Sequence, residues 1–190
     1  MPKLREFLQL RVSPQIGMPR LIPVPQDGRL PTFDKLRRLV GLLLDDRQRP
    51  AHAVIALTDV YTGTRDFIDA ADAKKQMIAW VGNEPRFYPH VALHDFEAWL
   101  IPFWPEIQQL AGSKRAQPSL HPETLDHGKP PAHILKEVFR TGSKGKSYVK
   151  PRDAARIMRD KSLELPAANC PELKALLNTL LVLCQADRLP

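Results

Sequence analysis

The sequence contains few of the residues that mark zinc sites, disulfide frameworks and membrane anchors. Its two cysteines, Cys170 and Cys184, form no C-x-x-C pair, which argues against a zinc knuckle and a secreted disulfide framework. No apolar run reaches the roughly 18 to 20 residues that span a bilayer, and the first ten residues, MPKLREFLQL, lack a signal-peptide core. We therefore predict a soluble, cytoplasmic protein that does not enter a membrane.

Acidic residues are scarce in one segment of the chain. Residues 129–161 hold ten basic and three acidic side chains, whereas the rest of the chain holds 18 of each, so the net charge of +7 comes from this segment. Such a positive potential suits phosphate groups or an acidic protein surface. The alternative is a solvated basic face without a partner. The predicted nucleic-acid contacts are Lys136, Arg140, Lys144, Lys146, Lys150, Arg152 and Arg156.

Strand and helix patterns alternate along the chain. The predicted elements are an edge strand at 20–24, helices at 34–46 and 66–80, strands at 53–57 and 87–93, a helix from His94, a turn at 122–125, and helices at 131–139, 151–158 and 171–184. This order predicts an α/β fold with a mainly parallel sheet and helices on both faces. We assign residues 1–104 to this core and residues 105–190 to a basic, mostly helical extension packed on it.

Ionisable side chains interrupt the apolar pattern where two predicted strands end. Asp59 follows the first strand, and His94, Asp95 and Glu97 follow the second. Loops and helix N-termini converge beyond the carboxyl ends of parallel strands, so we expect these residues at one edge of the sheet. On a helix from His94, His94 and Glu97 would share the polar side. Two or more carboxylates would form an oxygen site for Mg²⁺ or Mn²⁺. The alternative is that Asp95 starts a helix and Glu97 is solvated.

Two further motifs do not meet the requirements of the sites that they resemble. His90 and His94 have the spacing of zinc ligands on a helix, but in a strand residues four apart lie about 13 Å apart. The stretch GSKGKS at 142–147 lacks the first glycine of a phosphate loop, since Arg140 stands there, and no buried strand precedes it. We predict neither a zinc site nor a nucleoside triphosphatase. Tyr148, inside the basic segment, could stack on a base.

Five segments stand in order along the chain: TDVYTG at 58–63, HDFEA at 94–98, Pro122-Glu123 followed by PPAH at 130–133, YVK at 148–150, and Cys170-Pro171. Together they resemble, over roughly residues 20–184, the bacterial family called domain of unknown function 4276. That family is similar to Toprim domains of overcoming-lysogenization-defect nucleases, which are often encoded beside an ATPase in antiviral defence loci. The resemblance implies a Toprim-like α/β fold whose acidic residues bind a divalent metal and act on phosphodiester bonds.

The resemblance also implies roles for individual residues. Asp59 matches the aspartate at the end of a strand, Asp95 and Glu97 match a pair of acids, and Lys150 matches a later lysine. The implied function is a divalent-metal-dependent nuclease or nuclease subunit in which Asp59, Asp95 and Glu97 hold Mg²⁺ or Mn²⁺. Lys150 would stabilise charge on the phosphate, and His94 would orient a carboxylate or a water. The implied partners are DNA or RNA, an ATPase encoded nearby and, as an open alternative, a second copy of the chain.

The chain departs from the pattern of the family in three places. The strand ending in Glu-Gly that opens the family pattern is not found before MPKLREFL. The proline-serine-lysine-arginine segment reads Pro-Ala-His-Ile at 131–134, and the tyrosine-glycine feature reads Tyr-Thr-Gly at 61–63. The missing glutamate favours a second hypothesis, in which the protein is a non-catalytic adaptor that binds nucleic acid or an ATPase partner.

Overall fold

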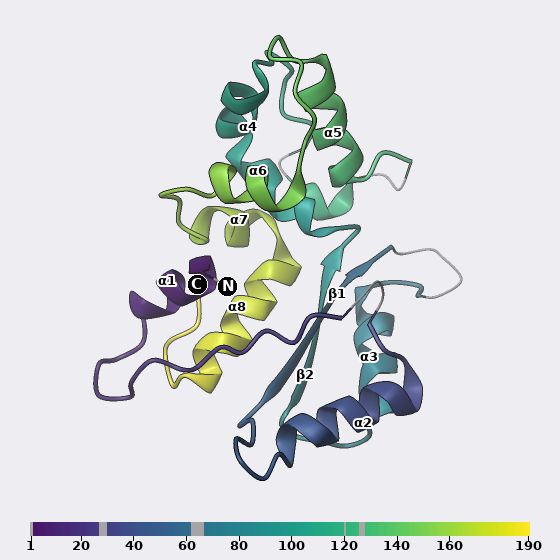
Figure 1. The fold of residues 1–190 in the computed structure, drawn as a ribbon, viewed down its shortest axis with the longest axis vertical. Helices are drawn as coiled ribbons and strands as arrows, with labels where there is room; N and C mark the ends of the chain where they lie inside the picture. Colours follow the sequence, from purple (N-terminus) through teal and green to yellow (C-terminus); the bar gives the residue numbers. More distant parts are fainter. Residues whose placement is uncertain (1, 27–29, 62–66, 120, 126–127) are drawn as a thin grey trace.

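Two parallel strands form the sheet of the described part of the chain (Figure 1). The computed structural model describes residues 2–26, 30–61, 67–119, 121–125 and 128–190. Strand β1, Val54–Val60, pairs with β2, Phe87–Leu93, in a register that sets Val54 opposite Phe87 and Val60 opposite Leu93. Both strands therefore end at the same edge of the sheet.

Helices cover both faces of this sheet. Successive strand residues point to opposite faces, and both faces of β2 are apolar near its end. Val91 packs in a cluster with α2, Phe33–Leu44, and α3, Ala70–Val81. Ala92 packs in a second cluster with α8, Pro171–Leu183, and α1, Pro2–Gln9. The structure is thus a mixed α/β fold with a small parallel sheet.

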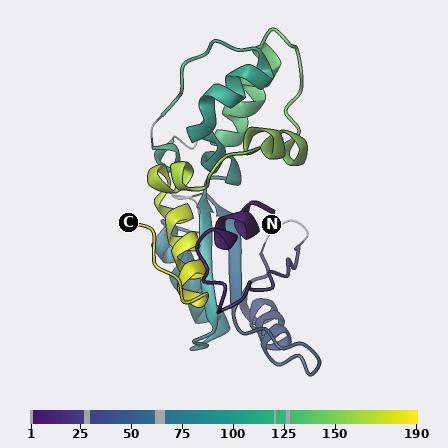
Figure 2. The same ribbon diagram turned by 90° about the vertical axis from the view of Figure 1, so that its left-hand side faces the viewer.

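A helical layer lies beyond the carboxyl ends of the strands. The 3₁₀ helix η1, Phe96–Phe103, leads directly into α4, Trp104–Ala111. The chain continues through η2, Pro122–Thr124, α5, Pro131–Thr141, α6, Lys150–Ile157, and α7, Glu164–Asn169. Side chains of η1, α4, α5 and α6 share one apolar cluster. Both views show α4, α5 and α6 grouped at one end of the molecule (Figure 1 and Figure 2).

Most of the predicted elements are confirmed, with ends displaced by a few residues. The helices predicted at 34–46, 66–80, 131–139, 151–158 and 171–184 correspond to α2, α3, α5, α6 and α8, and the strand at 87–93 to β2. The turn at 122–125 corresponds to η2, and the strand predicted at 53–57 continues to Val60. Within the described residues, no helix combines the length and the apolar character needed to cross a membrane.

Two of the predictions are wrong. Residues 20–24 form no strand, because Pro23 has no backbone N–H to donate to a neighbouring strand and its ring fixes the backbone. No helix begins at His94: that residue has a left-handed φ of 67°, and the 3₁₀ helix η1 starts two residues later, at Phe96. His94 and Glu97 therefore do not share the polar side of an α-helix.

Candidate active site

The end of β2 turns sharply at His94. The His94 N–H donates to the Val60 carbonyl at 2.8 Å, which extends the pairing of the two strands by one residue. His94 then adopts its left-handed conformation and Asp95 is extended, with a φ of −157°. A left-handed backbone is uncommon for a residue with a side chain and costs roughly 1 to 2 kcal/mol. This turn directs the chain into η1 so that Asp95 and Glu97 both lie at the carboxyl edge of the sheet.

Glu97 is a buried carboxylate with two partners from a distant part of the chain. Its side chain is 2% exposed. The Tyr148 hydroxyl donates to Glu97 Oε1 at 3.2 Å, and the Lys150 ammonium lies 3.0 Å from Glu97 Oε2. A buried charge needs an opposite charge and hydrogen bonds to be tolerated. Glu97 is therefore not the solvated side chain of the alternative interpretation.

Lys150 joins Glu97 to Asp59. Its ammonium lies 3.9 Å from Asp59 Oδ2 and 5.6 Å from the centre of the Phe96 ring. The Lys150 and Asp59 side chains are each about half exposed, so this end of the site faces solvent. One ammonium thus lies between carboxylates that come from β1 and from η1. Lys150 thus contacts Asp59 and Glu97, two of the acids with which it was predicted to act.

Asp95 lies at the N-terminus of α5. The Ala132 N–H donates to both of its carboxylate oxygens, at 3.2 and 3.1 Å, and the Tyr61 hydroxyl donates to Oδ2 at 3.5 Å. The first amides of a helix favour a negative charge because they have no partner within the helix. Burial nevertheless raises the pKa of Asp95 to about 6, and the negative charges of Glu97 and Asp59 act in the same direction.

Burial and neighbouring charges also shift the pKa values of Asp59, Lys150 and Tyr148. Burial raises the pKa of Asp59, and Lys150 only partly opposes this effect. Burial lowers the pKa of Lys150, but the Glu97 carboxylate outweighs it, so the ammonium is retained. Burial and Glu97 together raise the pKa of Tyr148, which keeps its hydroxyl protonated. Three carboxylates share one ammonium, an arrangement that attracts a further cation.

His94 takes a different position from the one expected. It is buried, and its ring lies edge-on to the Tyr61 ring, with the ring centres 6.2 Å apart. Tyr61 in turn reaches Asp95. His94 is therefore connected to Asp95 through Tyr61.

The basic side chains of residues 129–161 differ in whether they pair with other groups of the protein. All seven predicted nucleic-acid contacts are exposed. Arg152 and Arg156 lie 2.8 and 3.7 Å from the buried Asp153, and Lys144 donates to the Gln109 carbonyl at 2.6 Å. Within the part of the chain that the structure describes, Lys136, Arg140 and Lys146 form no ion pair. These three charges are available to an outside anion.

Sequence reasoning did not assign Tyr148 and Asp153 to the site. Asp153 accepts from the Val149 N–H at 2.7 Å, which fixes the start of α6 and places Lys150 as its first residue. Tyr148 is 9% exposed and its ring packs against Phe139, so the prediction that it stacks on a base is wrong. An aspartate three residues after the N-cap of a predicted helix is a local signal for such a contact.

The carboxylates are suitable ligands for Mg²⁺ or Mn²⁺, which prefer oxygen. Among the described residues, no three His, Cys, Asp or Glu side chains converge to hold a metal ion. Asp59 and Glu97 converge on Lys150 instead, and Asp95 faces α5. Mg²⁺ is commonly bound through one or two carboxylates, with waters and substrate phosphates as its other ligands. Asp59 and Glu97 carry carboxylate oxygens of the kind that such an ion binds.

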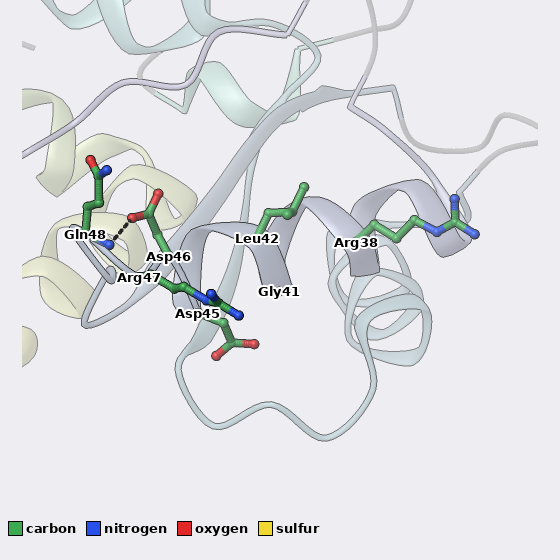
Figure 3. A pocket seen from close by; sticks show the side chains of 7 residues that line it. All are labelled: Arg38, Gly41, Leu42, Asp45, Asp46, Arg47 and Gln48. Atoms are coloured by element: carbon green, nitrogen blue, oxygen red, sulfur yellow. Dashed lines mark hydrogen bonds between the residues drawn. The ribbon is translucent and has the colours of Figure 1, made fainter.

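A surface hollow lies at the opposite edge of the sheet, beside the C-terminal end of α2 (Figure 3). Its lining consists of Arg38, Gly41, Leu42, Asp45, Asp46, Arg47 and Gln48. The Asp46 carboxylate accepts from the backbone N–H groups of Gln48 and Arg49, both at 2.8 Å. This carboxylate stabilises the loop before β1, and the hollow is not part of the acidic site.

Comparison with known proteins gives one match. The sequence profile of a family described as a domain of unknown function (DUF4276) matches residues 3–181. No curated protein and no solved structure matches the chain.

Proposed function

The chain belongs to the DUF4276 family, and from this premise we propose that it is a divalent-metal-dependent nuclease or nuclease subunit. The observation that supports this most is the contact of Lys150 with Glu97 and Asp59. It joins the basic segment to the acidic residues at the carboxyl edge of the sheet, where α/β proteins gather their functional groups. Phosphodiester chemistry needs both kinds of group, because phosphates must be attracted and their developing charge stabilised.

Each residue of the site would have its own role. Asp59 and Glu97 would hold Mg²⁺ or Mn²⁺, an ion that polarises a phosphate and lowers the pKa of a bound water. Lys150 would bind a phosphate oxygen and stabilise the charge that develops on it. Asp95, with a pKa near 6, can exchange a proton at neutral pH, and His94 would support the orientation of these acids through Tyr61.

The proposal extends to a Toprim-like core and to action beside an ATPase in bacterial antiviral defence. Both points rest on the five segments that resemble the family, since many α/β folds share acidic residues at the end of a parallel sheet. Lys136, Arg140 and Lys146 would hold the DNA or RNA backbone near the acids.

A second candidate function is a non-catalytic adaptor that binds nucleic acid or an ATPase partner. Two observations favour it: the Lys150 ammonium already lies against both carboxylates, and no group of three metal ligands forms among the described residues. This function predicts nucleic-acid binding that does not depend on Mg²⁺ and weakens steeply with salt.

The experiment that separates the two functions is cleavage of plasmid DNA and of labelled RNA with Mg²⁺ or Mn²⁺. We expect cleavage by the natural chain and a loss of about 100-fold in Asp59→Ala, comparable to the removal of one charge-stabilising group from an active site. Asp34→Ala, a change of the same kind on exposed α2, should leave the rate unchanged. Equal cleavage by the natural chain and Asp59→Ala contradicts the nuclease function, and metal-independent binding without cleavage favours the adaptor.

A further inference from the structure

We propose that Lys150 is an internal counter-ion that occupies the position of a divalent cation between Asp59 and Glu97 and is displaced when that cation binds. This inference deepens the proposed function, on which it rests for the identity of the ion. The ammonium lies 3.0 Å from Glu97 Oε2 and 3.9 Å from Asp59 Oδ2. Mg²⁺ binds carboxylate oxygens at about 2.0 to 2.1 Å, so an ion bound to both of these oxygens would have to take the place of the ammonium. Two cations so close would repel each other strongly.

The two oxygens of Glu97 have different roles. Oε1 accepts from the Tyr148 hydroxyl, a neutral donor that would not compete with a metal ion. Oε2 is buried, and its partner is the Lys150 ammonium at 3.0 Å. Because a buried carboxylate without a cation is costly, Oε2 must exchange one cation directly for another. Oε2 is therefore the oxygen through which Glu97 would bind the metal.

The surroundings allow the Lys150 side chain to leave while its backbone stays in place. The Val149 N–H donates to the buried Asp153 at 2.7 Å, and Arg152 donates to the same carboxylate at 2.8 Å. These contacts fix the first turn of α6. The Lys150 side chain itself is 49% exposed, so it can turn towards solvent. Displacement would thus free an ammonium at the place where a phosphate has to bind.

A structural ion pair would behave in the opposite way. If Lys150 served only to stabilise Glu97, its removal would leave a buried carboxylate that tends to protonate, and metal binding would not improve. If Lys150 competes with the metal, its removal must tighten metal binding. The direction of the change in affinity therefore separates the two roles.

The test is binding of Mn²⁺, without nucleic acid, measured at pH 8 by the electron paramagnetic resonance of the free ion. We expect Lys150→Met to bind Mn²⁺ about tenfold more tightly than the natural chain, because the metal no longer has to displace an ammonium from the two carboxylates. Lys35→Met, which removes an exposed charge from α2, should bind Mn²⁺ as the natural chain does. Addition of Glu97→Gln to Lys150→Met should abolish the gain. Unchanged or weaker binding by Lys150→Met, or no binding by any of the proteins, overturns the inference.

A second measurement uses the natural chain and so does not depend on the folding of a variant. Lysines are labelled with an acylating reagent, with and without saturating Mn²⁺, and each site is quantified by mass spectrometry. Labelling of Lys150 should rise at least severalfold with Mn²⁺, because the amine leaves the carboxylates, while labelling of Lys146 stays constant. Constant labelling of Lys150 contradicts the displacement. Tighter Mn²⁺ binding without nucleic-acid cleavage would remove the nuclease function and leave this inference standing, and cleavage without tighter binding would do the reverse.

Discussion

Asp95 is held in a position that disfavours its own charge. It is 3% exposed, and among the described residues the Ala132 amide donates to it while the Lys150 ammonium lies farther away. The ordinary pKa of 3.8 rises to about 6, first because of burial. Functional sites commonly keep groups of this kind, at a cost to the stability of the fold. The ionised form of Asp95 therefore destabilises the folded state.

The unfavourable burial of the Asp95 charge leads to a prediction for Asp95→Asn. The folded pKa lies above the unfolded one, so the folded state binds more protons between about pH 4 and pH 6, and stability falls as the pH rises through this window. An asparagine carbonyl can still accept from Ala132 but carries no charge. We expect the free energy of unfolding of the variant to exceed that of the natural chain by about 3 kcal/mol at pH 8, with little difference at pH 4. Urea unfolding at both pH values measures this.

The control for this prediction is Asp45→Asn. The Asp45 side chain is 78% exposed, so the same chemical change there should alter the free energy of unfolding by less than about 0.5 kcal/mol at either pH. If Asp95→Asn is as stable as the natural chain at pH 8, or if it gains equally at pH 4, the raised pKa is not the cause.

Single residues of the site could be predicted from the sequence only where a local rule applied. Asp59 and Glu97 stand out because charges follow the apolar runs of two strands, and parallel strands bring their ends together. Tyr148 gives no such signal, because its role depends on Glu97, which lies 51 positions away along the chain. The same long-range contact explains why Glu97 is buried although its local pattern also allowed a solvated side chain.

At the scale of elements, hydrophobic periodicity predicted a helix correctly where one face of the helix is apolar. It predicted the wrong helix type after His94, where the backbone turns. Helix α2 was predictable because Leu36, Val40 and Leu44 recur at helical spacing and are buried. The segment after His94 carries a similar spacing, with Phe96, Trp99 and Leu100. It forms a 3₁₀ helix with Pro102 inside, a choice that depends on the left-handed turn before it and on burial of Glu97.

Gly142 lies where the ends of α4 and α5 meet, although its sequence resembles a phosphate-binding loop. It begins the stretch that resembles a phosphate loop, but it ends α5 at a point where the chain passes very close to α4. A Cβ atom at this position would lie 2.1 Å from the Ala111 carbonyl oxygen. The Ser143 N–H then donates to the Gly112 carbonyl at 2.9 Å. The glycine is thus explained by the packing of two helix ends, without a nucleotide.

The pair Gly142→Ala and Gly41→Ala tests this explanation. Alanine at 142 forces backbone apart at the junction of α4 and α5, so we expect a loss of about 2 kcal/mol or more in the free energy of unfolding. Gly41 lies within α2, and a Cβ there meets nothing within 4 Å. Gly41→Ala should therefore stabilise the protein by about 0.5 to 1 kcal/mol, since alanine favours the helix. Urea unfolding that gave both variants the same sign would contradict the packing at Gly142.

Across the whole molecule, positive charge extends outward from the acidic residues. The N-terminus of α5 lies at Asp95 and the first residue of α6 lies at Glu97. Arg140 is eight residues beyond Ala132, about 12 Å along α5, and Lys146 follows in the next loop. These elements form the end of the molecule that carries α4, α5 and α6 (Figure 1). A bound strand that followed this charge would reach the acids at Lys150.

This path predicts how nucleic-acid binding depends on salt. The triple variant Lys136→Gln, Arg140→Gln, Lys146→Gln removes the three basic side chains that form no ion pair among the described residues. For a single strand we expect the slope of log affinity against log salt to fall by roughly 2, at about 0.7 for each lost phosphate contact. The matched control, Lys35→Gln, Arg38→Gln, Arg47→Gln, removes the same charge from exposed residues in and just after α2, away from the acids. Fluorescence anisotropy with a labelled oligonucleotide at several salt concentrations measures both slopes. The two variants have equal net charge. A reduced salt slope in the first variant alone would therefore place the nucleic-acid strand along α5. Equal slopes would mean that the attraction comes from net charge and that this path is wrong.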